Sequence, residues 1–262
     1  MIISLSNHKG GVGKTTSATS IASAMAETTE QRILLIDTDP SGNSTLLTTG
    51  HTNYDRDQSL YAVITANRTD APHILRDCIM PSNWYPNLHI LPGNHHTQEA
   101  QRILSGTPGA PFRLAQTLRS ISQQYAAVVI DTQPSFALLT EMALLSSDIV
   151  FIPTEPRYLE TSGLTQILTS IQSIRHGWEH LKLQVGGILI TKMDGRIRGH
   201  REMVHTLRQH PQLGKLIVGI IPVNEAVSYS HHAQKSIFQY DQHCSAAIAY
   251  SQFVQQLTRG RA

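Results

Sequence analysis

The chain has 262 residues, of which 40% are hydrophobic, and its formal net charge is +2 at pH 7. This length suits one large α/β domain, because such sheets often form single domains of about 200–250 residues. No run approaches the roughly 18 apolar residues of a membrane span, and the N-terminus lacks a signal-peptide pattern. Cys78 and Cys244 are far apart in sequence, which argues against a disulfide framework and against cysteine-based metal sites. We therefore expect a cytoplasmic protein.

Short apolar runs alternate with longer stretches in which apolar residues recur at three- and four-residue steps, as in a mostly parallel βαβ sheet. In chain order, the predicted elements are a strand over Ile2–Ser6, a helix over Thr15–Ala26, strands over Arg32–Asp37 and Leu88–Pro92, a helix over Phe112–Gln123, a strand over Ala126–Asp131, a helix over Phe136–Leu145, a strand over Ile149–Pro153, a helix over Leu159–Ile174, a strand over Val185–Thr191, a helix over Arg201–Gln209, a strand over Leu216–Pro222 and a helix over Ser245–Leu257. We expect a mostly parallel twisted sheet of about seven or eight strands, flanked by helices on both faces.

Residues 51–84 are polar and irregular, apart from a short helical pattern over Leu60–Ala66. We interpret this segment as an insertion over one edge of the sheet rather than as a second domain. No repeat or long linker divides the chain, so residues 1–262 are predicted to form one domain. We expect no helix-turn-helix domain ahead of the first strand, and hence no recognition of a specific operator.

The most informative segment lies between the first predicted strand and the first predicted helix, and reads Lys9-Gly10-Gly11-Val12-Gly13-Lys14-Thr15-Thr16. A glycine-rich turn that leads into a helix directs backbone N–H groups at one point, and the positive end of the helix adds to that field. Such a turn binds phosphate. Lys14 is positioned to reach the β- and γ-phosphates, and the Thr15 hydroxyl to ligate Mg²⁺. The pattern predicts a P-loop NTPase fold with a site for a nucleoside triphosphate.

The loop departs from the general G-x-x-x-x-G-K-[ST] pattern at its start. His8 stands where that pattern has glycine, and Lys9 adds a second lysine at the mouth of the loop. Since Lys14 already occupies the phosphates of its own loop, we predict that Lys9 reaches the nucleotide of a facing subunit, as an arginine finger does in trans.

Aspartates follow two of the predicted strands, at the sheet edge where ligands of open parallel sheets bind. Asp37 and Asp39 follow one strand, and Asp131 ends another. Asp131 has the position of an aspartate that holds Mg²⁺ directly or through water. Asp39 lies just beyond its strand, and we predict that it orients the attacking water.

These motifs resemble the ParA/MinD group of deviant-Walker ATPases, and within it the ParA side. The phosphate loop from Lys9 to Thr16 matches the deviant loop of that group, whose first lysine is its signature. Asp37-Thr-Asp-Pro-Ser-Gly-Asn43 resembles the D-x-D-P-Q-G-N segment with Ser41 in place of glutamine, and Asp131-Thr-Gln-Pro-Ser135 resembles D-x-P-P-S with Gln133 in place of proline. Looser matches are Thr191-Lys-Met-Asp194, Ile221-Pro-Val-Asn224 and Tyr240-Asp241.

The resemblance implies a cycle driven by ATP and Mg²⁺. ATP would bring two subunits face to face, with Lys9 of each on the other's phosphates, and the homodimer would bind nonspecific nucleoid DNA. Slow hydrolysis through Asp39, stimulated by an adaptor of the ParB or cargo kind, would release it and so position DNA or a protein assembly such as a carboxysome. Pro222 and Asn224 would lie near the adenine.

Basic residues are concentrated at the end of the chain. Residues 181–262 hold ten Lys and Arg against four Asp and Glu, which favours an anionic partner. Val223 and Ala226 stand where the family usually has arginines implicated in DNA contact. We expect the DNA face to come instead from other basic residues: Lys182, Arg196, Arg198, Arg201, Arg208, Lys215 and Lys235.

Two other functions fit the phosphate loop. A membrane-associated regulator of the MinD kind needs a basic amphipathic C-terminal helix, whereas residues 251–262 are glutamine-rich and weakly basic, so we expect a core-packing last helix and no membrane binding. A metabolic P-loop enzyme, such as a reductase or a ligase, would need paired cysteines or a dedicated substrate pocket, and the sequence reveals neither.

Overall fold

The computed structural model describes residues 1–157, 160–178 and 182–259. Its centre is an eight-stranded sheet in the order β3-β4-β2-β5-β1-β6-β7-β8. All neighbouring strands run parallel except β3, which pairs antiparallel with β4 at one edge. The strands are β1 (Ile2–Leu5), β2 (Ile33–Asp37), β3 (Met80–Pro81), β4 (Leu88–Leu91), β5 (Ala127–Asp131), β6 (Ile149–Thr154), β7 (Gln184–Met193) and β8 (Ile217–Pro222).

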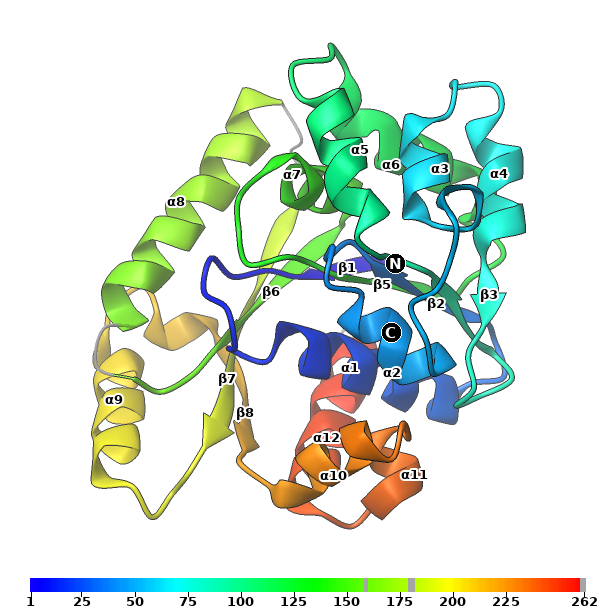
Figure 1. The fold of residues 1–262 in the computed structure, drawn as a ribbon. Helices are drawn as coiled ribbons and strands as arrows, with labels where there is room; N and C mark the ends of the chain where they lie inside the picture. Colours follow the sequence, from blue (N-terminus) through cyan, green and yellow to red (C-terminus); the bar gives the residue numbers. More distant parts are fainter. Residues whose placement is uncertain (158–159, 179–181, 260–262) are drawn as a thin grey trace.

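Helices cover both faces of the sheet (Figure 1). The α-helices are α1 (Lys14–Thr28), α2 (Asn43–Thr49), α3 (Leu60–Thr65), α4 (Ala71–Cys78), α5 (His96–Leu104), α6 (Arg113–Leu118), α7 (Leu138–Ser146), α8 (Glu160–Gly177), α9 (Arg198–Gln209), α10 (Glu225–His232), α11 (Ile237–Asp241) and α12 (Ser245–Arg259). Short 3₁₀ turns are η1 (Arg56–Gln58), η2 (Ala110–Phe112), η3 (Arg119–Ile121) and η4 (Gly214–Leu216).

The hydrophobic core is divided by the sheet, because successive side chains of a strand point to opposite faces. On β2, Leu35 packs in the core that α1 and α12 complete, whereas Leu34 and Ile36 pack in the core under α3 to α7. A third cluster continues this second face under α8 and α9. The strands are buried on both faces, which explains their continuous apolar runs.

The predicted fold class is confirmed: the sheet is mostly parallel, has eight strands, and carries helices on both faces. The predicted helix over Phe112–Gln123 is instead η2, α6 and η3 in succession, and the predicted start of α8 at Leu159 lies outside the described residues. The elements that the sequence pattern did not indicate are α2, α4, α5, α10, α11 and β3. Most of these are short helices, whose apolar residues show only one or two turns of periodicity.

Residues 51–84 contain α3, α4 and the edge strand β3, which pairs with β4. Within them α3 matches the predicted helical pattern, and it buries Leu60, Val63 and Ile64 completely against the sheet, while α4 adds Leu75. The segment thus contributes to the hydrophobic core and is not simply a polar surface loop. That it is an insertion stays a prediction.

The last helix packs as predicted. Tyr250, Phe253 and Val254 of α12 are buried in the core shared with α1. The Tyr250 hydroxyl also lies 3.0 Å from the Ser17 hydroxyl on α1, which joins the two helices. No helix in the described part of the chain has the length and apolar content that a bilayer crossing requires.

Candidate nucleotide-binding site

The loop from Lys9 to Gly13 connects β1 to α1 at the carboxyl edge of the sheet. Gly13 has φ 86°, in the left-handed region that glycine adopts without strain. α1 then begins at Lys14, and no side chain caps its first turn. Its free N–H groups therefore face the loop, and together with the helix dipole they form a site for an anion.

The loop borders a groove with two compartments. One, of about 420 Å³, is lined by the loop and by Asp39, Ser41 and Asn43. The other, of about 280 Å³, is lined by residues of β8, α10 and α12. The compartments are adjacent, since both are lined by Gly13, Thr16 and Lys192. The groove has the form of a phosphate pocket that continues into a less polar pocket for a base.

Lys14 holds the phosphate loop in its curved form. Its Nζ donates a hydrogen bond of 2.7 Å to the carbonyl of Lys9, across the mouth of the loop. Burial lowers the pKa of Lys14, while the nearby Asp131 and Asp39 carboxylates oppose this shift. Lys9 itself is half-buried, and its side chain passes close to Gly163 on α8. The two lysines thus come from one loop but extend to different places.

Asp131, at the end of β5, lies beside the loop in a fully buried position. Its Oδ2 accepts a hydrogen bond of 2.8 Å from Ser44, whereas Oδ1 makes no hydrogen bond in the described part of the chain. Burial raises the pKa of Asp131 to about 6, against the opposing effects of the Thr15 and Ser44 hydroxyls and of Lys14. An unsatisfied carboxylate oxygen next to the Thr15 hydroxyl fits the hard oxygen ligands that Mg²⁺ prefers. These are the residues that would hold the ion.

The two aspartates after β2 have different environments. Asp37 is fully buried, and its Oδ2 accepts hydrogen bonds from the N–H and the hydroxyl of Thr45. Burial, followed by the Asp131 charge, raises the pKa of Asp37 well above its usual value. Asp39 instead lines the phosphate compartment, where its Oδ1 accepts from the N–H and the hydroxyl of Ser41 at 2.9 and 2.8 Å. Asp37 is therefore held by local hydrogen bonds within the protein, whereas Asp39 is the one of these two carboxylates that lines the phosphate compartment.

Pro222 and Asn224 line the base compartment. Asn224 caps α10, since its Oδ1 accepts from the Ala226 N–H at 2.9 Å, and its amide nitrogen donates to Ser245 at 3.1 Å. The structure therefore gives Asn224 two local bonds at the rim of this compartment. Contact with adenine stays a prediction.

Two residues at the end of β7 were quoted from the sequence without a role, and the structure shows that both hold the phosphate loop. The Thr191 hydroxyl donates to the Val12 carbonyl at 2.8 Å, and the Lys192 Nζ donates to the Gly11 carbonyl at 2.5 Å. Lys192 has φ 51°, which is rare for a residue with a side chain. A lysine that lines both compartments is a candidate functional residue that the loop motif by itself could not reveal.

Glu155, just after β6, is the partner of Lys192. It is only 7% exposed, and its two oxygens bind Lys192 at 2.5 Å and Arg157 at 2.6 Å. β6 and β7 are neighbours, so their carboxyl ends bring Glu155 and Lys192 together beside the loop. The Thr-Lys pair after an apolar run was the only sequence signal for this contact.

The departures from the family pattern have local explanations. His8 packs its ring on Phe136 at 4.2 Å between centroids, which occupies the space at the start of the loop. Gln133 donates from Nε2 to Gln101 on α5 at 2.9 Å, so it ties the segment after β5 to a helix. Ser41 binds Asp39 as described above.

The basic residues proposed for DNA are not brought together. Lys182 precedes β7 and Lys215 precedes β8, whereas Arg196, Arg198 and Arg201 follow the carboxyl end of β7. β7 and β8 are parallel, so the two groups lie at opposite ends of a ten-residue strand, about 30 Å apart. Lys235 lies in a third place, between α10 and α11.

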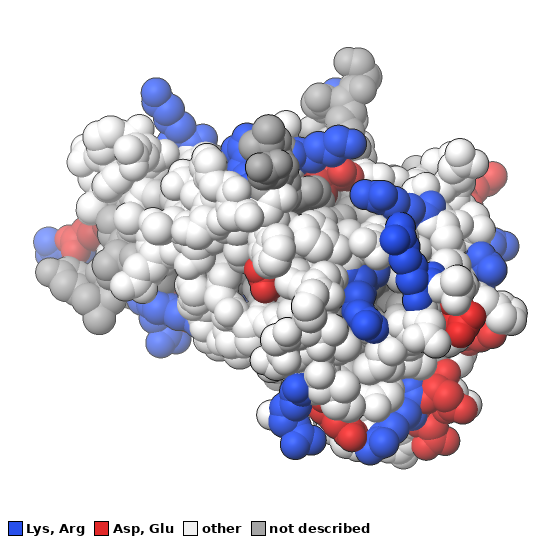
Figure 2. Space-filling model, turned by 90° about the horizontal axis from the view of Figure 1, so that it is seen from above, with Lys and Arg blue, Asp and Glu red and all other residues white. Residues whose placement is uncertain are grey.

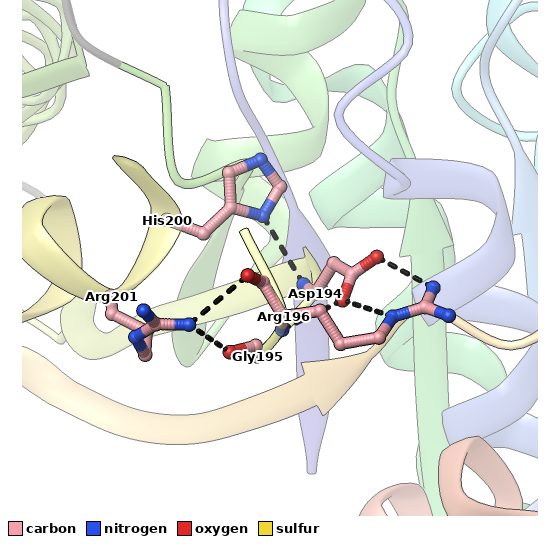
Figure 3. A network of polar contacts seen from close by, with 5 residues as sticks. All are labelled: Asp194, Gly195, Arg196, His200 and Arg201. Carbon is pink, nitrogen blue, oxygen red and sulfur yellow. Dashed lines mark hydrogen bonds and ion pairs between the residues drawn. The ribbon is translucent and has the colours of Figure 1, made fainter. Parts of the chain in front are cut away.

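The arginines after β7 are engaged in local contacts, and Figure 3 shows those of Arg196 and Arg201. Arg196 makes a two-pronged ion pair with Asp194, at 3.0 and 2.8 Å, and Arg198 pairs with Glu202 at 2.6 Å. Arg201 donates to the carbonyls of Gly195 and Arg196. Lys182, Lys215 and Lys235 are exposed and make no ion pair with any described residue, so their charges are available to a ligand.

Comparison with known proteins agrees with this geometry. A protein-family model described as an AAA domain matches residues 1–185. The chain is 33% identical to the chromosome partitioning protein ParA of Caulobacter vibrioides over 253 residues, which cover 95% of this chain and 90% of that protein. The chain belongs to the ParA/MinD family of P-loop ATPases. The family that the motifs indicated is thereby confirmed.

Other members and neighbours of the family are consistent with this assignment. The sporulation initiation inhibitor protein Soj of Bacillus subtilis is 31% identical over 251 residues, or 95% of this chain and 94% of Soj. The fold is also that of cobyrinic acid a,c-diamide synthase from Mycobacterium smegmatis, solved with an ATP analogue and magnesium. The TM-score is 0.78 at 24% identity, over 98% of this chain and 94% of that one.

Proposed function

We propose that this ParA-family protein is an ATPase that uses ATP and Mg²⁺, pairs with a second copy when ATP is bound, and holds nonspecific DNA in that state. Hydrolysis stimulated by an adaptor protein then releases it, so that the protein positions DNA or a protein cargo on the nucleoid, in the cytoplasm. Residues 1–262 act as one ATPase domain, with residues 51–84 as an edge insertion. The observation that carries the proposal is the phosphate loop with two lysines, in which the Lys14 side chain bridges the mouth of the loop and the Lys9 side chain lies near Gly163 on α8.

The phosphate compartment supports hydrolysis. Lys9, Lys14 and Asp39 are the proposed catalytic residues, and Thr15 and Asp131 the proposed magnesium ligands. Bound Mg²⁺ neutralises charge on the phosphates. Asp39 orients a water whose oxygen bonds to the γ-phosphorus while the bond to ADP breaks, giving ADP and phosphate. Ser41 holds Asp39 through two hydrogen bonds, which is compatible with slow turnover before a partner acts.

Nucleotide-dependent retention on nonspecific DNA tests this function. The Asp39→Ala variant should retain ATP without hydrolysing it. We expect this variant to bind DNA strongly in the presence of Mg-ATP and weakly in the presence of Mg-ADP. Because phosphate contacts release counterions, a dimer with six such contacts should lose about 10³ in affinity between about 50 and about 200 mM salt. Equal retention with ATP and ADP would refute the proposal. Turnover stimulated by a small metabolite and indifferent to DNA would favour a metabolic enzyme instead.

The same assay locates the DNA face. The exposed lysines at the amino ends of β7 and β8 should contribute most to DNA binding. The double variant Lys182→Ala/Lys215→Ala should therefore bind DNA more weakly, and its DNA affinity should depend less steeply on salt. Arg198→Ala is the matched control, because Glu202 already neutralises that arginine. Binding to anionic vesicles, with none to DNA, would favour a MinD-like function. The burial of α12 in the core argues against that outcome.

A further inference from the structure

A second cavity lies away from the nucleotide groove, on the sheet face covered by α3 to α7. It measures about 400 Å³ and is bordered by the end of α3, the α3–α4 connection, the segment leading into η2, and α6 with η3. None of its lining residues lines either compartment of the nucleotide groove. It is therefore a separate site on the molecule.

Arginines dominate the polar lining of this cavity. Arg68, Arg113 and Arg119 line it, and no Asp or Glu does. Arg68 and Arg119 are exposed and make no ion pair with any described residue, whereas Arg56 on the same face pairs with Glu99 at 2.7 Å. Figure 2 looks onto this face, and basic side chains gather right of its centre, on the side of α3, α4 and α6. The cavity is a positively charged concavity without an internal counterion.

Arg113 is fixed before any ligand arrives. Its Nη1 donates to the carbonyls of Ile64 and Ala66 at 2.9 and 3.1 Å, where α3 ends. These bonds use one of the three guanidinium nitrogens and hold the group in one orientation. The other nitrogens remain for an anion, with less side-chain entropy to lose on binding.

Apart from Gln116 and Thr117, the rest of the lining is apolar. Val63 and Ala71 are buried, and Pro72 and Pro108 complete this part of the wall. A volume of this size is within the range of small-molecule sites, and the lining combines an apolar floor with polar groups that could orient a ligand. Guanidinium groups match phosphate through paired N–H donors. We infer that this cavity binds a small organic phosphate, with the phosphate on the arginines and the apolar part on the floor.

Calorimetry with phenyl phosphate tests the inference, on protein saturated with Mg-ADP so that the phosphate loop is already filled. We expect one saturable site, with tighter binding than inorganic phosphate because the floor contributes, and tighter binding than benzoate because the arginines favour phosphate. Arg68→Ala/Arg119→Ala should weaken phenyl phosphate at least tenfold, since charged hydrogen bonds are lost. Arg113 is left intact, because its removal would also uncap α3.

Arg76→Ala is the matched control, as Arg76 is an exposed arginine of α4 that does not line the cavity. It should leave phenyl phosphate binding unchanged, and both proteins should bind Mg-ADP as the parent does. The inference is overturned if no saturable binding occurs on the ADP-filled protein, if benzoate binds as tightly, or if the double variant binds like the control. These results do not depend on dimerisation or DNA binding, so they would leave the proposed function standing.

Discussion

Asp131 combines complete burial with a carboxylate oxygen that has no hydrogen bond in the described part of the chain. Such an arrangement costs stability unless a proton or a cation occupies the oxygen. Burial accordingly raises the pKa of Asp131 to about 6, so that in the nucleotide-free protein a proton binds this carboxylate as pH falls through that value, at the place where a magnesium ion would bind. The same residue thus links metal binding to pH.

The affinity for Mg-ADP should therefore depend on pH through Asp131. A carboxyl pKa raised to about 6 means that Asp131 is protonated as pH falls below that value, and the neutral carboxyl group no longer attracts the metal, because the proton competes with it. We expect affinity to be constant above that pH and to fall by up to about tenfold per pH unit below it. Asp131→Asn should bind more weakly and lack this extra slope. Titration of the nucleotide itself affects the parent protein and Asp131→Asn equally. If calorimetry gives the same dependence of Mg-ADP affinity on pH for both proteins, Asp131 does not link metal binding to pH.

At the scale of elements, the ends of β6 and β7 hold the phosphate loop from the side. Thr191 and Lys192 bind two successive loop carbonyls, and Glu155 fixes Lys192 in place. The N–H groups of the loop are then left to face the groove. This contact between three strand ends orients the loop before nucleotide arrives, and preorganisation of this kind increases affinity.

Lys192→Met should weaken Mg-ADP binding by about tenfold, since a charged hydrogen bond to the loop is lost. Glu155→Gln should have a smaller effect, and the double variant should bind no more weakly than Lys192→Met, because Glu155 acts through Lys192. Lys182→Met, at an exposed lysine before β7, is the control and should bind normally. If the loss of binding free energy in the double variant equals the sum of the losses in the two single variants, Glu155 does not act through Lys192.

At the scale of the whole molecule, the central question is whether two copies share their nucleotides. Lys14 bridges its own loop, while the Lys9 side chain lies close to Gly163 on α8. A second copy facing this groove would bring another Lys9 toward the same phosphates. In the proposed dimer, Lys9 would therefore matter more for pairing of two copies than for nucleotide binding within a single chain.

Light scattering of Asp39→Ala with Mg-ATP should report a dimer, since the nucleotide is retained. Adding Lys9→Ala should return the protein to a monomer, whereas ATP affinity measured by titration should change by less than about threefold, because the contacts to Lys14 and the loop N–H groups remain. Lys9→Arg, which keeps the charge, should restore part of the dimer. A dimer of undiminished stability without Lys9 would remove that lysine from the interface.

Much of this architecture was predictable because its signals are local. β2 and β5 are short apolar runs that end in aspartate, and the structure has them within one residue of the predicted bounds. The phosphate loop is a run of consecutive residues whose conformation is set by glycine and by the following helix. Short helices such as α4 were not predicted, because eight residues with a few apolar contacts acquire their helical form mainly from packing on the sheet.

The amino-acid sequence by itself determined the order of the seven parallel strands and of most of the longer helices, the phosphate loop with its two lysines, and the family. Each of these can be predicted from short runs of neighbouring residues or from the periodicity of apolar residues. Only the tertiary structure decided that Lys192 and Glu155 hold the loop, that Asp37 is buried while Asp39 faces the groove, and that the basic residues of the last third lie at opposite ends of β7. The physical reason is the parallel sheet, which gathers strand ends that are distant in the chain and separates residues that are close in it.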